Sequence, residues 1–535
     1  MSTRSLRLGM ITVALLVCAC RGGADTPSGG RDAVPSATSA ETGPPPQSTK
    51  ELVLAAPRDL APGEKDPYYA AATLKVWESL VTVDDEWTPQ PQLALSWEPA
   101  ADGLSWTFHL RQDVVFSDRS PFNAGAVVAN INRYLAISPR SSPFYSLNKT
   151  VAYGDLTRVE QLDPFTVRFV HGTPAPSFPA MIATYFSAIF APASFAENGD
   201  FTGPPIATGP FRVVERRPDQ YVLLEANPHY RGTPPRSARI RVRTIPDPNT
   251  RVSALRAGEI QGVLDLGAIQ PAAVQALTRG GDFQESSAPI AITHYIFVNG
   301  TRAPFSDARL RQAISLAVDR RRVVDDLFNG YGLPAGSMLS SVSKQWHDPS
   351  ITLPADPNRA ALLAREVLGG RRQAAVVIIP SFQLDRYPYK ALGEYLQAQL
   401  RPLGIDAEIR ILESAAFNKV AADGEYDLAL RTQGLASSDP ESLFRGYLGR
   451  DGATNKGFSF GYASAEVEQA LSALLRESNE ARRKEQFVRL QQAAARDLPV
   501  IPLFYEKGVV IVAKEVQGYV LSTSGGVSLE TAWRK

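Results

Sequence analysis

Cysteine is almost absent from this chain. Its two cysteines, Cys18 and Cys20, both lie close to the N-terminus. The rest of the chain therefore has no cysteine pair for an internal disulfide and no cysteine cluster for a metal site. A chain of 535 residues is long enough to derive its stability from a large hydrophobic core and to form two or three lobes.

Charge of one sign and clustered histidines are lacking as well. The chain has 56 Lys and Arg against 55 Asp and Glu, a formal net charge of +1, which excludes a strongly basic surface for nucleic acid. The five histidines are scattered without the spacing of metal ligands. No glycine loop followed by lysine marks a phosphate site. We therefore predict no cofactor, no metal, no nucleic-acid partner and no ATPase activity in this chain.

The one marked apolar run lies at the N-terminus, and it is short. Arg4 and Arg7 precede an apolar stretch over residues 8–17, which is too short to span a bilayer and has the pattern of a secretory signal. A small residue before Cys20 resembles a bacterial lipobox. This resemblance implies that residues 1–19 are a signal peptide and that Cys20 is the lipidated mature N-terminus. The alternative is an ordinary signal cleaved elsewhere.

Residues 20–50 comprise the predicted lipid-anchor cysteine and a linker. The linker is rich in Gly, Ser, Thr, Pro and Ala and has almost no large apolar residues, so it cannot bury enough surface to fold. We expect a disordered tether that holds an extracytoplasmic body near a bacterial membrane through the lipid alone. After it, no apolar run approaches the length of a membrane span.

Regular patterns in the remaining sequence predict strands and helices. Residues 104–111, LSWTFHLR, alternate apolar with polar side chains, which is typical of a half-buried β-strand. A second strand piece over 114–116 and a helix from Pro121 should follow. Elsewhere strands and helices interleave without a fixed-length repeat, which predicts an α/β fold. Further elements are expected as a strand over 239–243, helices over 250–258, 307–328, 467–475 and 480–497, and a strand over 500–505.

Six segments, in order along residues 80–505, carry a resemblance to a known family. They read LALSWEP; LSWTFHLR with its continuation; IATGPFRVVE with NPHYRG; IRVRTIPDPNTRVSALRAGEI; FVNGTRAPFSDARLRQAISLAVDR; and LPVIPLFY. Together they resemble the family 5 extracellular solute-binding proteins, which supply peptide and nickel ABC importers.

The resemblance implies an α/β fold of the periplasmic-binding-protein type, class II (cluster C), with two main lobes, a hinge and an inserted third lobe. Ligand is expected between lobes I and III, which close around it by hinge motion. Such closure reports occupancy to a permease and is not catalysis. The expected boundaries are residues 51–84, 206–291 and 501–535 for lobe I, 85–205 for the inserted lobe II, and 292–500 for lobe III.

The implied function is that of a binding lipoprotein, not an enzyme, that serves an ABC importer. We expect it to be a monomer that captures an extracytoplasmic peptide or peptide-like solute and delivers it to a permease with separate ATPase subunits. A nickel or metallophore receptor of the same family is the alternative.

The segment over residues 426–444 should hold the ligand's polar groups. In dipeptide binders of the family, an Asp here binds the α-amine and a Trp lies nearby. The corresponding positions in this chain are Ala436 and Gln433, so the amine anchor is missing. Asp439 is a substitute, unless it caps the following helix. Ser437 lies in the same stretch and is a further candidate.

Other candidate contacts come from a cation and from aromatic rings. Arg431 could bind a carboxylate, since guanidinium does so bidentately, or it could form an internal salt bridge. In the nickel branch an Arg stands where this chain has Tyr185. Aromatic surface is expected from Tyr69, Phe144 and Tyr185, each of which could instead pack in the core. Thr523, in a C-terminal Ser/Thr/Gly-rich loop, is a further candidate.

A rival class is an extracytoplasmic hydrolase. Residues 457–461, GFSFG, match the G-x-S-x-G pattern around Ser459. That elbow requires a buried strand before the serine and a helix directly after it. Here a polar loop precedes the motif, which argues against a nucleophile.

Overall fold

The computed structural model describes residues 47–60, 73–136, 153–183 and 187–535. All of these belong to the compact unit Pro44–Lys535. The predicted signal peptide, most of the predicted linker and Cys20 lie outside the described residues, as do Tyr69, Phe144 and Tyr185. Within the described ranges, no helix is both long and apolar enough to cross a membrane.

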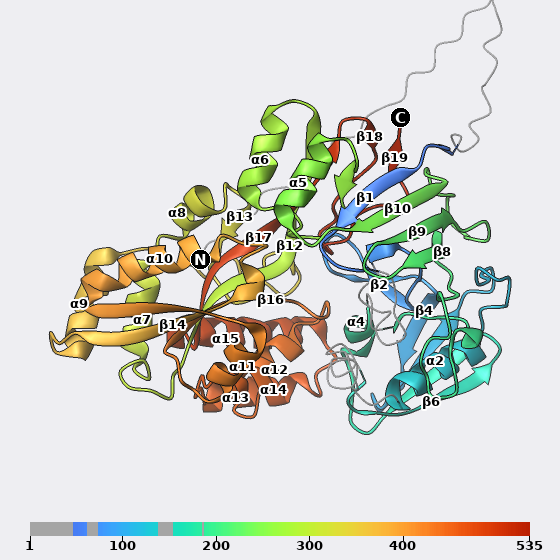
Figure 1. Ribbon diagram of the computed structural model, residues 1–535. Coiled ribbons are helices and arrows are strands. Elements are labelled where there is room, and N and C mark those ends of the chain that lie inside the picture. Colours follow the sequence, from blue (N-terminus) through green and yellow to red (C-terminus); the bar gives the residue numbers. More distant parts are fainter. Residues whose placement is uncertain (1–46, 61–72, 137–152, 184–186) are drawn as a thin grey trace, which may run out of the picture. The chain divides into compact units, whose positions relative to one another are not determined.

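A mixed eleven-stranded sheet is the main element of the fold (Figure 1). Its order is β15-β14-β16-β12-β17-β11-β1-β10-β9-β8, and β13 pairs with β17 off this path. The strands are β1 Leu52–Ala56, β8 Phe211–Arg217, β9 Tyr221–Ala226, β10 Arg239–Thr244, β11 Gly262–Val263, β12 Phe283–Val298, β13 Gly332–Pro334, β14 Gln373–Pro380, β15 Ile405–Leu412, β16 Leu428–Gly434 and β17 Val500–Ala513.

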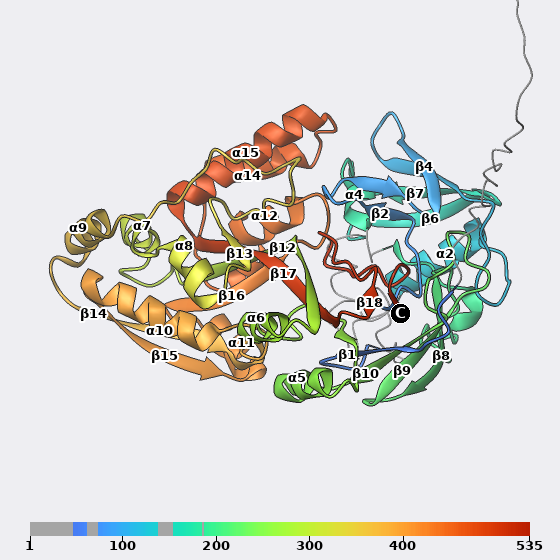
Figure 2. The same cartoon turned by 90° about the horizontal axis from the view of Figure 1, so that it is seen from above.

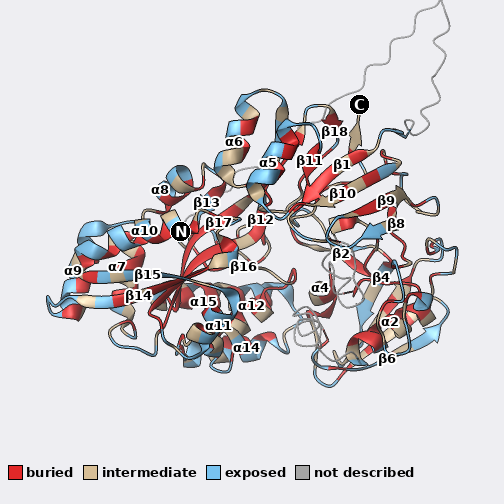
Figure 3. Ribbon diagram, viewed as in Figure 1, coloured by how far each residue is buried: buried red, intermediate tan, exposed pale blue. Residues whose placement is uncertain are grey.

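One end of this sheet is built around β1, which runs parallel to β10 and β11. Four of its five residues are buried, and β1 is correspondingly red in Figure 3. The strand predicted over 239–243 is confirmed by β10, in which Ile240 and Val242 are buried. Its Arg241 forms an ion pair with Glu51 at 2.7 Å. Helices α5 Pro248–Arg256 and α6 Pro271–Arg279 and the short strands β18 Val516–Gln517 and β19 Trp533–Arg534 complete this part.

A separate four-stranded antiparallel sheet has the order β4-β5-β7-β6. The predicted strand is confirmed by β5, in which Phe108 and Leu110 are buried. The predicted helix begins three residues later than Pro121, because Pro121 forms a bridge with Val115 and the Asn123 side chain accepts a hydrogen bond from Ala126 N. The elements are β2 Val81–Val83, β3 Pro89–Pro91, β4 Ala94–Pro99, β5 Ser105–Leu110, α2 Ala124–Ala136, β6 Leu156–Asp163, β7 Thr166–His171 and α4 Phe178–Ile182.

At the other end of the large sheet, helices cover both faces of β14, β15 and β16, as Figure 2 shows. Residues of β16 alternate between two cores: Leu428 and Leu430 face one, and Ala429 faces the other. The helices are α7 Ala308–Ala317, α8 Arg320–Arg322, α9 Pro357–Leu368, α10 Tyr389–Leu400, α11 Ser414–Ala422, α12 Glu441–Leu448, α13 Ala453–Gly457, α14 Ala465–Leu474 and α15 Glu480–Asp497.

Most of the predicted helices in this part are confirmed, but one is shorter than expected. The helix predicted over 307–328 ends at Ala317, because Val318 adopts an extended conformation (φ −93°, ψ 112°). Asp319 then caps a new turn by accepting from the amides of Arg321 and Arg322. Local helical spacing continues through this break, so the spacing alone could not reveal it.

The long strands β12 and β17 connect the two ends of the large sheet. They pair antiparallel over most of their length, with irregular register between Pro289 and Thr293. The predicted lobe boundaries at residues 291 and 500 fall within these two strands. One buried core joins β1 with the small sheet, whereas two others flank β16. The three-lobe division with its hinge stays a prediction.

Candidate functional site

The carboxyl ends of β14, β15 and β16 form the first part of the candidate site. These strands are parallel, so their carboxyl ends meet at one edge of the sheet, which we call the carboxyl edge. Open α/β sheets bind ligands outside such an edge. The strands end there at Pro380, Leu412 and Gly434. Arg431 and Gln433, in the last four residues of β16, are therefore placed where a ligand is expected.

Arg431 is half-buried and lies among aromatic rings. Its guanidinium carbon is 5.0 Å from the ring centre of Phe458 and 5.6 Å from that of Phe417. Burial lowers the pKa of Arg431, although the hydroxyls of Tyr447 and Tyr389 oppose that effect. A guanidinium keeps its charge in proteins, so a fixed cation lies at the carboxyl edge. The internal salt bridge that the sequence left open is absent among the described residues.

Polar side chains continue along the carboxyl edge. Gln433 accepts a hydrogen bond from the hydroxyl of Tyr447 at 3.1 Å, which orients its amide. Gln383 donates to the Thr432 hydroxyl at 2.9 Å, while its buried Oε1 has no partner within the described ranges. Next to it, Phe382 is 47% exposed. Sequence analysis missed both residues, although their place within three residues of the end of the buried strand 373–380 is a usable signal.

Ser437 and Asp439, both predicted ligand contacts, have internal partners. The Ser437 hydroxyl donates to Asp439 O at 2.6 Å. One Asp439 carboxylate oxygen accepts from Glu441 N at 2.9 Å, at the start of α12, and the other accepts from Arg483 at 2.6 Å. Burial raises the pKa of Asp439, and Arg483 offsets part of that rise. Asp439 therefore matches the helix-capping alternative, and we leave both residues out of the proposed ligand contacts.

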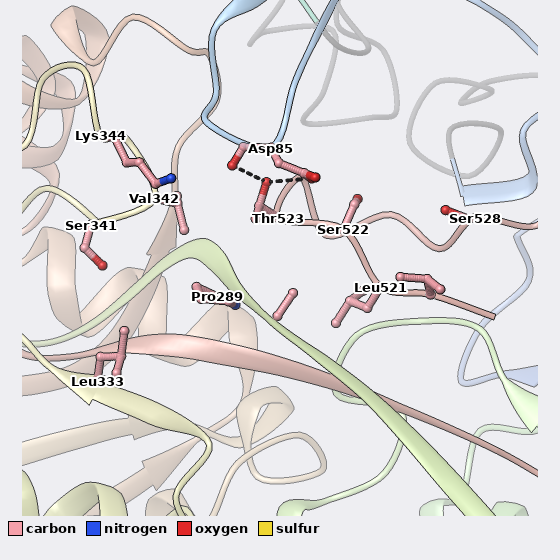
Figure 4. A pocket seen from close by; sticks show the side chains of 12 residues that line it. Asp85, Pro289, Leu333, Ser341, Val342, Lys344, Leu521, Ser522, Thr523 and Ser528 are labelled. Carbon is pink, nitrogen blue, oxygen red and sulfur yellow. Dashed lines mark hydrogen bonds between the residues drawn. The ribbon is translucent and has the colours of Figure 1, made fainter. Parts of the chain in front are cut away.

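A pocket of about 540 Å³ forms the second part of the site (Figure 4). Its walls come from β12, β13, two loops and the segment between β2 and β3. Thr523, a predicted ligand contact, lies in the pocket wall and donates to Asp85 O at 2.9 Å. The lining residues are Asp85, Ala288, Pro289, Leu333, Ser341, Val342, Lys344, Val520, Leu521, Ser522, Thr523 and Ser528.

A small buried cluster lies next to both parts of the site. Trp87 packs with Ala291, Val342 and the partly buried Leu435, and its indole N–H donates to Thr523 O at 3.2 Å. Leu435 directly follows β16, and Val342 lines the pocket. The cluster therefore links the carboxyl edge to the pocket. Sequence analysis did not select Trp87, since a lone tryptophan in a turn carries no motif.

Three sequence-predicted ligand contacts cannot be placed. Tyr69, Phe144 and Tyr185 lie outside the described residues. Of the others, Arg431 and Gln433 come together on β16 and Thr523 lies in the pocket wall. The predicted set is thus divided between the carboxyl edge and the pocket, and the Trp87 cluster joins them.

The serine-hydrolase pattern lacks its structural context. Ser459 follows the short helix α13 and has a φ of 48°, whereas the elbow needs a strand before the serine. Its hydroxyl makes no hydrogen bond to a histidine in the described part of the chain. Groups of three or more His, Cys, Asp or Glu that could hold a metal ion do not occur there either.

Known proteins resemble this chain over most of its length. The family model for bacterial extracellular solute-binding proteins, family 5, matches residues 88–455. Heme-binding protein A of Haemophilus influenzae is 26% identical over 491 residues, 86% of this chain and 88% of that protein. Glutathione-binding protein GsiB of Escherichia coli K12 is 26% identical over 496 residues, 87% of this chain and 91% of that protein.

Solved structures share the fold. NikA from Brucella suis, in complex with Fe(III)-EDTA, has a TM-score of 0.80 at 24% identity and covers 91% of this chain and all of its own. DppA from Helicobacter pylori, in complex with the peptide STSA, has a TM-score of 0.73 at 22% identity and covers 91% of this chain and 98% of its own. These matches confirm the predicted fold class. Since the family model matches well over half of its length, the chain belongs to the bacterial extracellular solute-binding proteins, family 5.

Proposed function

We propose that this chain binds a peptide or peptide-like solute outside the cytoplasm and delivers it to an ABC permease. The observation that carries this proposal is the combination at the site of a half-buried cation, Arg431, an oriented amide, Gln433, and a pocket next to them that is lined by both apolar and polar side chains. Peptides offer a carboxylate, amides and apolar side chains to such a surface. A relative named for binding glutathione, itself a peptide, adds support.

A metal chelate is the second candidate solute. The fold match to NikA, which was solved with Fe(III)-EDTA, favours it. A chelate could be held through carboxylates by Arg431 without any protein ligand to the metal. An enzyme on this scaffold is less well supported, because no histidine is among the residues that line the pocket.

Thermal unfolding with candidate solutes tests the function. A solute that binds only the folded chain stabilises it by RT ln(1 + [L]/Kd), about 2.7 kcal/mol at a hundredfold excess over Kd. We expect peptides or peptide-like solutes to raise the melting temperature of the secreted chain, and native mass spectrometry to show one solute on a monomer. If metal chelates alone raise it, the peptide proposal is wrong and the second candidate replaces it.

We also propose that Cys20 carries the lipid anchor. The support is the apolar run followed by a small residue and cysteine. Replacing Cys20 by serine should move the protein from the membrane fraction of the expressing cells to the soluble fraction and abolish labelling by a fatty-acid analogue. Cys18→Ser is the matched control and should leave both unchanged. Membrane retention of the Cys20→Ser protein would contradict the proposal.

A further inference from the structure

We propose that Arg431 binds a carboxylate of the solute, so that the solute class is a peptide-like acid. The inference rests on the proposed function and narrows its solute class. It follows from three observations: the hydrogen-bond acceptors that the fold provides for its buried arginines, the aromatic rings around Arg431, and the partners of the carboxylates near it.

The fold supplies acceptors to the buried arginines Arg251, Arg320 and Arg483, whereas the half-buried Arg431 has none among the described residues. Arg251 donates to Ala268 O, Ile245 O and Pro246 O, and Arg320 donates to Pro502 O, Ser315 O and Leu353 O. Arg483 has Asp439 and two further carbonyls. The Arg431 side chain makes no hydrogen bond or ion pair among the described residues, although it has five N–H donors. An unpaired, partly desolvated cation is costly, so an acceptor supplied by the solute is the natural complement.

The surroundings of Arg431 suit this role. Phe458 and Phe417 attract the cation through their ring faces and restrict its rotamers. Stacking of this kind leaves the in-plane N–H groups free, and these match the geometry of a carboxylate. Because the side chain is already held, it loses little conformational entropy when the solute binds. Arg431 is thus preorganised, although none of the acidic side chains that the structure describes pairs with it.

The described buried carboxylates near the carboxyl edge are already engaged, which disfavours a buried amine as the main anchored group. Asp439 pairs with Arg483, and Glu441 pairs with Arg445 at 2.7 Å. Glu506 accepts from Tyr387 at 2.9 Å and lies 3.2 Å from a nitrogen of the buried His294. Glu413 and Asp385, which also lie near this edge, are exposed to solvent. Among the described buried and half-buried charged groups of the edge, the one without a partner is therefore positive, and the solute should present a negative group to it.

The test compares acid and amide forms of one solute. Peptides and acylated amino acids are titrated into the full secreted chain as free carboxylates and as their carboxamides, together with non-peptide dicarboxylates and metal chelates. We expect the wild type to bind the carboxylate form at least tenfold more tightly than the carboxamide. In Arg431→Met this preference should disappear, while binding of the carboxamide persists and reports that the site is folded. Arg431→Lys should keep part of the preference, since it keeps the charge but loses the bidentate geometry.

Arg410→Met is the matched control. Arg410 lies on β15, which β14 separates from β16, is half exposed and already pairs with Glu408, so the preference should remain. An equal preference in Arg431→Met and the wild type would overturn the inference and leave the proposed function intact. Arg431-dependent binding of dicarboxylates or chelates without any peptide would overturn the proposed function and keep the carboxylate anchor. Failure of every compound in the panel to bind, whether carboxylate or carboxamide, would overturn both.

Discussion

Replacing Arg483 by methionine should lower the free energy of unfolding by about 3 to 5 kcal/mol, the usual cost of removing one partner from a buried ion pair. Arg483 and Asp439 have side-chain exposures of 5% and 2%. The variant leaves the Asp439 carboxylate buried without its cation, and it removes the donors that reach Leu474 O and Glu477 O. This network joins the start of α12 to α14 and α15. Urea unfolding of the purified chain measures the loss in the free energy of unfolding.

Arg482→Met provides the control for this prediction. Arg482 precedes Arg483 on the same helix, but its side chain is 71% exposed and 3.7 Å from Glu477, so little change is expected. Combining Asp439→Asn with Arg483→Met should restore part of the loss, because no uncompensated charge remains. If Arg483→Met and Arg482→Met have equal free energies of unfolding, the Arg483–Asp439 pair does not support the fold. If the double variant folds but no longer binds a solute that the wild type binds, Asp439 is a ligand contact after all.

Asp439 also shows where prediction from the sequence stops. The residue types around it indicated two possibilities, a ligand anchor and a helix cap, and local sequence could not separate them. The partner that favours the cap is Arg483, far along the chain on α15. A pairing of this kind depends on how α12 packs against α15, which no local pattern encodes. Arg431 was recognisable as a candidate from its place near the end of a predicted strand, but its lack of a partner was visible only in the structure.

In the fold, too, local features could be predicted from the sequence and non-local features could not. Strand β5 and helices α5, α14 and α15 follow from apolar periodicity and capping residues, and all were predictable. The order of the large sheet was not, because β1 pairs with β10 and β11, which come much later in the chain. The pocket escaped prediction for the same reason. Its walls, from Asp85 to Ser528, meet only after β12 and β17 have paired.

Acid should destabilise this chain through His171 in particular. The His171 side chain is 5% exposed and lies against Phe178, with ring centres 4.5 Å apart. Its Nε2 has no hydrogen-bond partner among the described residues. Burial lowers the pKa of His171 from 6.5 to about 4, although Asp155 opposes that shift. Below pH 6.5 the unfolded chain binds a proton that the folded chain does not bind until the pH is near 4. Stability from the neutral ring is therefore complete above pH 6.5 and is lost as the pH falls to 4.

The expected loss between pH 7 and pH 4 is about 3 kcal/mol. A pKa lowered from 6.5 to about 4 corresponds to about 3.4 kcal/mol in full, at about 1.4 kcal/mol per unit, and the folded chain is half protonated at pH 4. His171→Phe keeps an aromatic ring against Phe178 and removes the titrating group. Urea midpoints of the wild type and of this variant, measured from pH 7 to pH 4, should therefore converge or cross as the pH falls. The buried His294, whose pKa burial also lowers, acts equally in both proteins and cancels in the difference. Parallel curves for the two proteins would show that His171 takes up its proton in the folded chain as readily as in the unfolded one. The variant His171→Leu would separate that result from a packing defect introduced by phenylalanine.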